Sequence, residues 1–283
     1  MRKLALAEYH TIFPILEVNK QTSTFAYAVC DQIINGEIFV NERVTAGLIV
    51  TANGIYYLFG DTHDQDFQHT LFSYIQNDVL TKGNRFTLFT SSKEWEMVIE
   101  NHFKDSLKKI PRKKFLFQRN IFEDRKRGLD DSTYKVMRID KNIVEKSTEF
   151  TERYYKEYWG SKEVFLNNGF GFYIIHDQKV VIECVSIFRS NVFAEIDIAT
   201  DSDYQGRGLA RLVATYFIEH CIQNGVTPCW DCNMDNMPSQ RLASKLGFDQ
   251  PVEYTLYVRK KVEGKDERRI NKIQSEAREE SPR

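Results

Sequence analysis

The chain has 283 residues, a length that suits two modest domains or one large one. Its 42% hydrophobic content excludes global disorder, and its net charge of −1 gives no bulk electrostatic reason to bind nucleic acid or a membrane. No apolar run approaches the ~20 residues of a membrane span, and the N-terminus reaches Glu8 too early for the core of a signal peptide.

Five cysteines occur in the chain. An odd number without a secretion signal predicts reduced thiols and a cytoplasmic location. Cys229 and Cys232 form a Cys-x-x-Cys motif, but a redox pair needs its first cysteine at a helix N-terminus, and this pair falls in a predicted strand. A zinc site would need a second ligand pair, so we expect core cysteines and no metal.

The first hundred residues have the pattern of a compact α/β domain. In chain order, the predicted elements are a helix at 24–34, strands at 37–40, 46–50 and 55–59, a helix at 67–80, a strand at 85–89 and a helix that Ser92 caps. Asn53-Gly54 predicts a hairpin turn between the second and third strands. The turn after the third strand is acidic (60–66), and its carboxylates would repel a phosphate.

The segment at 104–127 is basic, with phenylalanines interleaved. Such a pattern can bind a nucleic-acid strand by charge and stacking. We favour a linking strand at 114–119, because its residues alternate and exposed lysines are mostly solvated. Nucleic acid is therefore not an expected partner.

The second half begins near residue 134. Its predicted elements are a strand at 134–139, one or two helices within 141–159, a hairpin of strands at 171–175 and 180–188, a strand at 193–200, a helix from Leu209 to Gly225, a strand at 228–232, a helix that ends at Gly247 and a strand at 254–258. The tail after Arg259 is dense in charge, so we expect residues 263–283 to be a solvated helix or disordered.

A glycine-rich turn joins the predicted strand at 193–200 to the next helix. Gly206 and Gly208 let the backbone approach a ligand, and the first turn of the helix offers unpartnered N–H groups and the positive end of its dipole. The turn therefore predicts a cradle for a pyrophosphate. The Gly-Lys-Ser/Thr of a Walker loop and the context of a dinucleotide fold are absent.

Two motifs resemble one family. Gln205-x-x-Gly208-x-Ala210 resembles the acyl-CoA loop of the GNAT N-acetyltransferases, and the run from Asn236 to Phe248 resembles the last helix of that fold, with Ala243 where the family commonly has Tyr. Their order and separation make the resemblance specific over about 130–260. Features at 195–200, 208–210 and 228–231 resemble the branch that includes the zwittermicin A resistance acetyltransferase.

The resemblance implies a fold, a cofactor and a reaction. It implies an α/β mixed-sheet fold with a GNAT domain at 129–262, after an accessory α/β domain at 1–128 that is either a degenerate GNAT-like half or an unrelated partner domain. The acidic turn at 60–66 predicts that this first domain has no CoA site. Acetyl-CoA would lie between the strands at 193–200 and 228–232, and an amine would attack its thioester directly in a ternary complex. The residues implied to hold acetyl-CoA are Ile198, Ala199, Thr200, Gln205, Gly206, Arg207, Gly208, Leu209, Ala210, Asn236 and Ser239.

A group must also take the proton of the acceptor ammonium, whose pKa is near ~10. Glu195 and Asp197 share one strand face, opposite Ala194 and Ile196, and Asp231 lies on the neighbouring strand. All three are candidate bases, and a bulge in the strand could exchange its faces. Because Ala243 cannot act as the acid, either none is required or Ser239 or Tyr254 serves.

These observations favour a cytoplasmic acetyl-CoA-dependent N-acetyltransferase that acts on a primary amine of a small polar acceptor. One alternative is a tandem-GNAT transferase that takes amino acids from tRNA, which the two-part architecture and the basic segment suggest. Another is a non-catalytic acyl-CoA-binding module, which the missing Tyr suggests. The sequence does not identify the acceptor or the oligomeric state.

Overall fold

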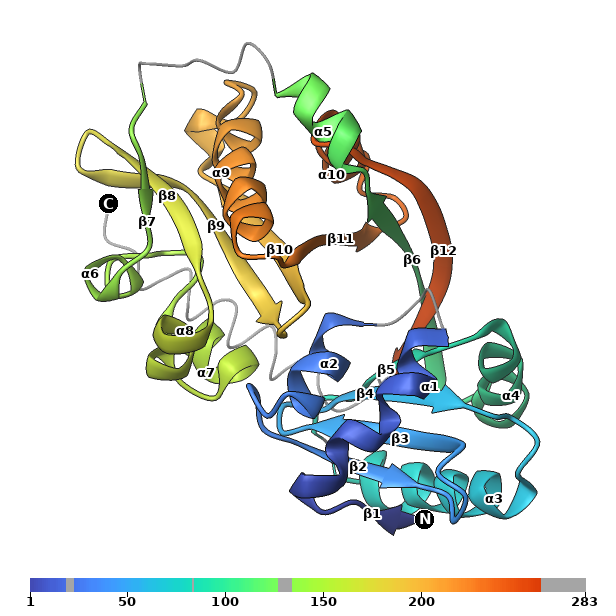
Figure 1. Ribbon diagram of the computed structural model, residues 1–283. Helices are drawn as coiled ribbons and strands as arrows, with labels where there is room; N and C mark the ends of the chain where they lie inside the picture. Colours follow the sequence, from blue (N-terminus) through green and yellow to red (C-terminus); the bar gives the residue numbers. More distant parts are fainter. Residues whose placement is uncertain (19–22, 83, 127–133, 261–283) are drawn as a thin grey trace.

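The computed structural model of the protein describes residues 1–18, 23–82, 84–126 and 134–260. The predicted α/β class is confirmed, because the described residues form one continuous mixed sheet with helices on both faces (Figure 1). The prediction for the tail at 263–283 lies outside the described residues.

The strands are β1 (Arg2–Lys3), β2 (Gly36–Val40), β3 (Ala46–Thr51), β4 (Ile55–Gly60), β5 (Thr87–Thr90), β6 (Leu107–Phe117), β7 (Val136–Arg138), β8 (Gly171–His176), β9 (Lys179–Arg189), β10 (Phe193–Thr200), β11 (Thr227–Asn233) and β12 (Phe248–Arg259). The α-helices are α1 (Phe13–Val18), α2 (Thr24–Cys30), α3 (Gln65–Tyr74), α4 (Lys93–Phe103), α5 (Arg119–Arg125), α6 (Lys141–Val144), α7 (Glu152–Trp159), α8 (Lys162–Asn168), α9 (Leu209–Gln223) and α10 (Met237–Lys245). Short 3₁₀ or π segments occupy Leu6–Ile12, Ile75–Val79 and Ser202–Tyr204.

Local signals in the sequence locate most of these elements. Gly54 has φ 78° in the turn between β3 and β4, which pair antiparallel as the predicted hairpin requires. The Ser92 side chain accepts a hydrogen bond from the Trp95 N–H at 3.3 Å and so caps α4 as predicted. Helix α8 was not predicted, although Ser161 caps it by accepting from the Val164 N–H at 3.2 Å.

The sheet exchanges one strand between the two halves of the sequence. Its order is β1-β2-β3-β4-β5-β12-β6-β11-β10-β9-β8-β7. Strand β6, from the first half, therefore lies between β11 and β12 of the second half, and β12 in turn reaches β5. Figure 1 shows these two long strands running side by side from one lobe to the other. The first half thus supplies a strand to the neighbourhood of the predicted site.

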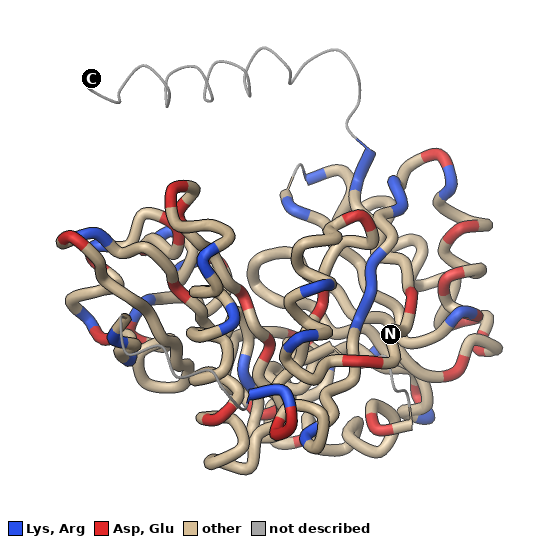
Figure 2. The backbone as a smooth tube through the Cα atoms, turned by 90° about the horizontal axis from the view of Figure 1, so that it is seen from above, with Lys and Arg blue, Asp and Glu red and all other residues tan. Residues whose placement is uncertain are grey.

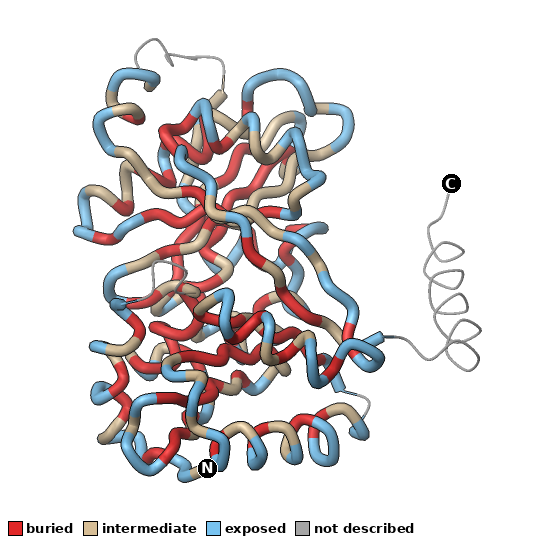
Figure 3. Tube along the Cα trace, turned by 90° about the vertical axis from the view of Figure 1, so that its right-hand side faces the viewer, coloured by how far each residue is buried: buried red, intermediate tan, exposed pale blue. Residues whose placement is uncertain are grey.

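The cores follow this exchange. One buried cluster covers one face of the sheet in both halves and includes Phe25 of α2, Tyr57 of β4, Tyr155 of α7 and Phe188 of β9. The other face has one cluster under α9 and α10 and another under α3 and α4. Buried residues accordingly continue through the waist between the lobes (Figure 3). The division at residue 128 stays a prediction.

The surface carries both signs of charge on both lobes (Figure 2). No helix in the described ranges combines the length and apolar character that a membrane span requires.

Candidate functional site

The site begins where β10 and β11 separate. These parallel strands pair from Phe193 with Thr227 to Glu195 with Cys229, and there the ladder between them ends. Past that point β11 pairs on its other side with β6, as far as Asn233 opposite Arg112. A cavity of about 870 Å³ occupies the opening, and Ile198 and Thr200 of β10 lie on its wall opposite Trp230 to Asn233 of β11. The sheet is therefore split at the position that the sequence predicted for the cofactor.

One wall of the cavity is the predicted glycine-rich turn. Gln205, Gly206, Gly208, Leu209 and Ala210 line it, whereas Arg207 and Ala199 do not. The Arg207 guanidinium instead lies 4.7 Å from the centre of the Tyr204 ring. The turn and the strand end thus contribute most, but not all, of the residues expected at the cofactor.

The conformation of this turn explains its glycines. Gly206 has φ 77° and Gly208 has φ 83°, where a side chain is strained, although a Cβ at either would meet nothing within 4 Å. Among the described residues, the backbone N–H groups of Gly206, Arg207 and Gly208 have no backbone acceptor. Gly208 directly precedes α9, whose first N–H groups have no partner within the helix. The turn therefore presents a row of free donors and a positive helix end.

The start of α10 forms the facing wall. The Asn236 side chain caps the helix by accepting a hydrogen bond from the Ser239 N–H at 3.1 Å, as predicted. The Ser239 hydroxyl accepts a hydrogen bond from Nε1 of Trp230 at 3.0 Å. Both Asn236 and Ser239 line the cavity, whereas Ala243 is fully buried in the core.

Sequence reasoning missed the basic side chains that α9 and α10 contribute to the cavity. Arg211, Arg241 and Lys245 line the cavity, and the buried Nε of Arg211 has no hydrogen-bond partner among the described residues. The spacing of Arg241 and Lys245, four apart on one helix, was a signal that they share a face. Together with the free N–H groups of the turn, these cations favour a ligand with several negative charges.

The predicted carboxylates lie on the other face of the split sheet. Ala194 and Ile196 pack beneath α9, so Glu195 and Asp197 point away from it, toward α2 and α7. The ladder between β9 and β10 does contain a bulge at Glu195 and Ile196. It leaves the alternation of faces along β10 as predicted.

Asp197 is hydrogen-bonded and lines the cavity. Its Oδ2 accepts a hydrogen bond from the hydroxyl of Tyr154, on α7, at 2.8 Å. Burial raises the pKa of Asp197, and the Tyr154 hydroxyl opposes that rise. This carboxylate is therefore held in one orientation at the mouth of the split.

Asp231 is held more firmly. Arg112 of β6 donates from Nε to its Oδ1 at 2.7 Å and also from Nη2, while the hydroxyl of Tyr254 donates to Oδ2 at 2.5 Å. Only 9% of the Asp231 side chain is exposed. Burial raises the pKa of Asp231, and Arg112 and Tyr254 oppose the rise. The paired guanidinium makes Asp231 the carboxylate that we expect to carry the negative charge.

Arg112 was missed as a site residue. The alternating pattern predicts a linking strand at 114–119 with solvated lysines around it, whereas β6 begins seven residues earlier, at Leu107, and ends at Phe117. Yet Arg112 lines the cavity and bonds Asp231, 119 positions further along the chain. The alternation of residues located the strand, but local sequence does not reveal which strands it will lie between.

Glu195 differs from Asp231 because no guanidinium is hydrogen-bonded to it among the described residues. Across the described ranges it forms no salt bridge, in contrast to Asp231. Burial and the negative charge of Asp231 raise the pKa of Glu195 to about 7, while Lys114 and Arg112 oppose the rise. A carboxyl with such a pKa can take or release a proton near neutral pH.

The corresponding turn of the first half is acidic, and its own carboxylates accept from two of its backbone N–H groups. It follows β4, and the Asp64 side chain accepts from the Phe67 N–H at 2.9 Å, so a carboxylate already caps α3. Asp61 accepts from the backbone N–H of His63 at 2.9 Å and adds a second negative charge. These contacts disfavour a phosphate there.

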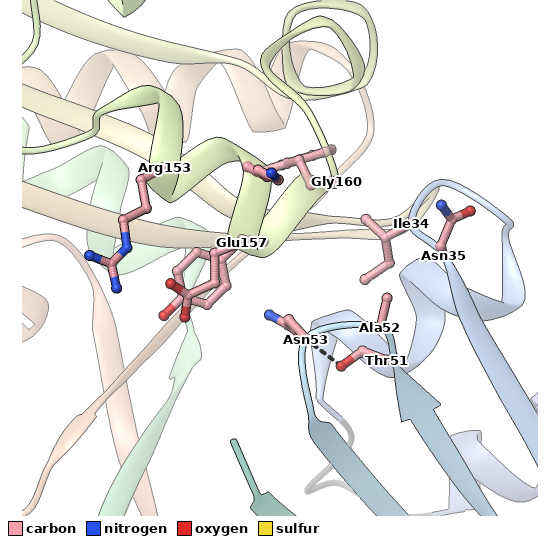
Figure 4. A pocket seen from close by; sticks show the side chains of 11 residues that line it. Ile34, Asn35, Thr51, Ala52, Asn53, Arg153, Glu157 and Gly160 are labelled. Atoms are coloured by element: carbon pink, nitrogen blue, oxygen red, sulfur yellow. Dashed lines mark hydrogen bonds between the residues drawn. The ribbon is translucent and has the colours of Figure 1, made fainter. Parts of the chain in front are cut away.

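A second hollow, of about 350 Å³, lies where the halves meet (Figure 4). Figure 4 shows Arg153 and Glu157 of α7 on one side and Asn53 and Thr51, near the β3–β4 turn, on the other. None of the predicted site residues lines it. It marks the junction of the two halves.

Comparisons with known proteins agree with this geometry. The sequence pattern of the family described as GNAT acetyltransferase matches residues 15–257. The chain is 38% identical over 260 residues to the uncharacterized N-acetyltransferase YdfB of Bacillus subtilis (strain 168), covering 91% of this chain and 98% of YdfB.

Solved structures share the fold. A GCN5-related N-acetyltransferase-like protein from Streptococcus suis 89/1591 superposes with a TM-score of 0.65 at 22% identity, over 90% of this chain and all of that one. A tandem GNAT protein from the clavulanic acid biosynthesis pathway has a TM-score of 0.59 at 10% identity, over 90% of this chain and 95% of its own. At these identities the likeness is one of fold.

Proposed function

Because the chain belongs to the GNAT acetyltransferase family, we propose that it is an N-acetyltransferase that moves an acetyl group from acetyl-CoA to a primary amine of a small polar acceptor. The observation that carries this proposal is one continuous cavity. It joins the free N–H groups of the 205–210 turn on one face of the sheet to Asp197 and Asp231 on the other. Cofactor and acceptor could therefore meet through the split.

The residues present fit acetyl-CoA. The N–H groups from Gly206 to Ala210 would hold its pyrophosphate, and Arg211, Arg241 and Lys245 supply positive charge for its phosphates. The separated edge of β10 at Ile198 to Thr200 would face the pantetheine arm, with Asn236 and Ser239 across from it. Acetyl-CoA supplies an activated thioester, and the chain supplies position and charge.

The three carboxylates would have two roles, proton transfer and attraction of the acceptor. Glu195 does not itself line the cavity, so it would accept the proton of the attacking ammonium through water, and its pKa of about 7 allows it to be ionised at neutral pH. Asp197 and Asp231 would attract the cationic acceptor. The hydroxyl of Ser239 lines the cavity, whereas the hydroxyl of Tyr254 donates to Asp231, so Ser239 is the better placed to protonate the departing thiolate.

Two finer points follow the same proposal. The carboxylates favour a cationic acceptor, which agrees with the resemblance at 195–200 to the zwittermicin A resistance branch. The five cysteines are free in the structure, which suits the reducing environment that we propose for this protein, the cytoplasm.

An assay of thiol release from acetyl-CoA tests the proposal. The purified chain would be screened against primary amines, aminopolyols and amino sugars, with mass spectrometry to detect the acetylated product. We expect amine-dependent release and an acetyl adduct on nitrogen. Stable acetyl-CoA binding without turnover over the whole panel would contradict the enzyme and favour a binding module instead. Transfer that requires aminoacyl-tRNA would favour a tandem-GNAT aminoacyl transferase.

A further inference from the structure

The proposed acceptor side contains one arginine that the first half of the chain contributes. Arg112 lies on β6, which enters the second half between β11 and β12. Its register partners are Asn233 on one neighbour and Tyr254 on the other. The guanidinium thus lies among the side chains of the split sheet although its strand belongs to the other half of the sequence.

The contacts of Arg112 are directional. Its Nε and Nη2 both donate to Oδ1 of Asp231, and its Nη1 donates to Oδ1 of Asn233 at 2.6 Å. Asp231 Oδ2 is left for the Tyr254 hydroxyl. A carboxylate bonded at both oxygens is fixed in orientation, and the charge-assisted bonds from the guanidinium favour its ionised form.

The Arg112 guanidinium is bonded to Asp231 and not to Glu195. The groups that face Glu195 and Asp231 are Arg112 and Lys114 of β6, Cys229 of β11, Tyr254 of β12 and Asp197 of β10. Two of these are cations, and Arg112 donates hydrogen bonds to Asp231. Arg112 therefore distinguishes two buried carboxylates whose charges influence each other.

We propose that Arg112 is a positioning residue of the transferase site: it fixes Asp231 as a bound anion and so leaves Glu195 to take the proton of the acceptor. The role rests on the proposed acetyltransferase function. It also gives the strand exchange a function: β6, inserted between β11 and β12, brings this guanidinium to the site. The first half of the chain then contributes a residue to the reactive site.

The test compares three variants over a range of pH. Arg112→Met removes the charge and the hydrogen bonds with little change of side-chain volume. Arg112→Lys keeps the charge but cannot make the paired hydrogen bonds of a guanidinium. Lys108→Met removes a charge from the exposed part of the same strand. Without the guanidinium, both macroscopic pKa values of the Glu195–Asp231 pair must rise. The acid limb of kcat/KM in Arg112→Met should therefore move to higher pH by about one pH unit.

The remaining variants give the contrast. Arg112→Lys should restore most of the position of the limb but not the full kcat, and Lys108→Met should match the wild type in both. A purely structural role would lower the melting temperature and reduce rates equally at every pH. A folded Arg112→Met protein with an unmoved acid limb would overturn the proposal.

A readout without turnover separates this proposal from the function on which it rests. In protein labelled with carbon-13 at the glutamate carboxyl, the Glu195 signal is assigned by its loss in Glu195→Gln, and its titration is followed by NMR. We expect its midpoint to rise in Arg112→Met and to stay unchanged in Lys108→Met. If the wild type acetylates nothing yet this titration shifts, the proposed function fails and the coupling stands. If the wild type is active and the midpoint stays, the coupling fails alone.

Discussion

Tyr154 and Asp197 are joined by a hydrogen bond of 2.8 Å, donated by the tyrosine hydroxyl to Oδ2 of the carboxylate. The bond connects α7 to β10 and fixes the orientation of a carboxylate that lines the cavity in the split sheet. Two positions earlier on the same face, Glu195 has no ion-pair partner among the described residues. Two carboxylates on one strand face thus have different surroundings.

The first prediction concerns proton transfer. Glu195→Gln should lower kcat/KM at pH 7 by ~100-fold, because general base catalysis typically contributes that much or more. In the wild type, kcat/KM should fall as pH drops below about 7, where Glu195 becomes protonated. This acid limb should vanish in the variant, and rates should recover partly at high pH, where free amine is abundant. Initial rates over pH 5.5 to 9.5 measure both.

Glu183 provides the matched control. It is 2% exposed on β9, and burial raises its pKa to about 7 as well. Neither Glu183 nor Glu195 lines the cavity, but Glu183 lies on the strand next to β10 and accepts a hydrogen bond from the Ser147 hydroxyl at 2.5 Å. Glu183→Gln should therefore keep the acid limb of kcat/KM. If Glu183→Gln removes the limb and Glu195→Gln keeps it, Glu195 is not the base.

The second prediction concerns stability. The pKa of Glu195 is raised by folding from 4.5 to about 7, so the native state holds a proton that the unfolded chain releases over this window. Stability from this group is present below pH ~4.5 and is lost as pH rises through ~7. Glu195→Gln should therefore be more stable than the wild type at pH 8, by ~1–3 kcal/mol, and show no such gain at pH 4. Urea unfolding at both pH values measures the difference.

The third prediction concerns the acceptor. Asp197→Asn should raise KM for a cationic acceptor by ~5-fold or more with a smaller effect on kcat, because it removes an attractive charge. Tyr154→Phe removes only the bond that orients the carboxylate and should change KM in the same direction by less. A loss confined to kcat in Asp197→Asn, with an altered pH profile, would instead assign Asp197 to proton transfer.

The fourth prediction concerns the glycine-rich turn. Acetyl-CoA at 100 times its Kd should stabilise the native state by ~2.7 kcal/mol and raise the melting temperature. Gly208→Ala should reduce or abolish this shift, because alanine at φ 83° distorts the row of N–H donors. Gly225→Ala is the matched control: it also has a positive φ, 68°, and open space, but lies beyond the far end of α9. Equal ligand shifts in the two variants would remove the turn from the cofactor site.

The fifth prediction concerns the two halves. Isothermal titration should give one CoA per chain, because Asp64 caps α3 where the first half would need free N–H donors. Asp64→Asn keeps the cap and removes the charge, so it should leave the stoichiometry unchanged. A stoichiometry of two would refute the proposal that residues 1–128 have no CoA site.

The sequence predicted the features that are set by residues close together along the chain. Alternation located β10, φ-demanding glycines located the turn before α9, and an Asn before a helix located the cap at Asn236. These features are set within a few residues, and so a single sequence contains them.

The rest depended on pairing between distant segments. Nothing near Arg112 in the sequence says that β6 will lie between β11 and β12, so its bond with Asp231 could not be predicted. For the same reason the sequence offered three candidate bases without ranking their charge states. The ranking comes from partners on other strands, namely Arg112 and Tyr254 for Asp231, and from α7 for Asp197.

A crystal structure of the protein with CoA tests the central claim most directly. The account predicts the pyrophosphate against the N–H groups of Gly206 to Ala210, the pantetheine between β10 and β11, and the thiol directed through the split toward Glu195. CoA bound away from this split, or bound in it with the thiol directed away from the face that bears Glu195 and Asp197, would contradict the account.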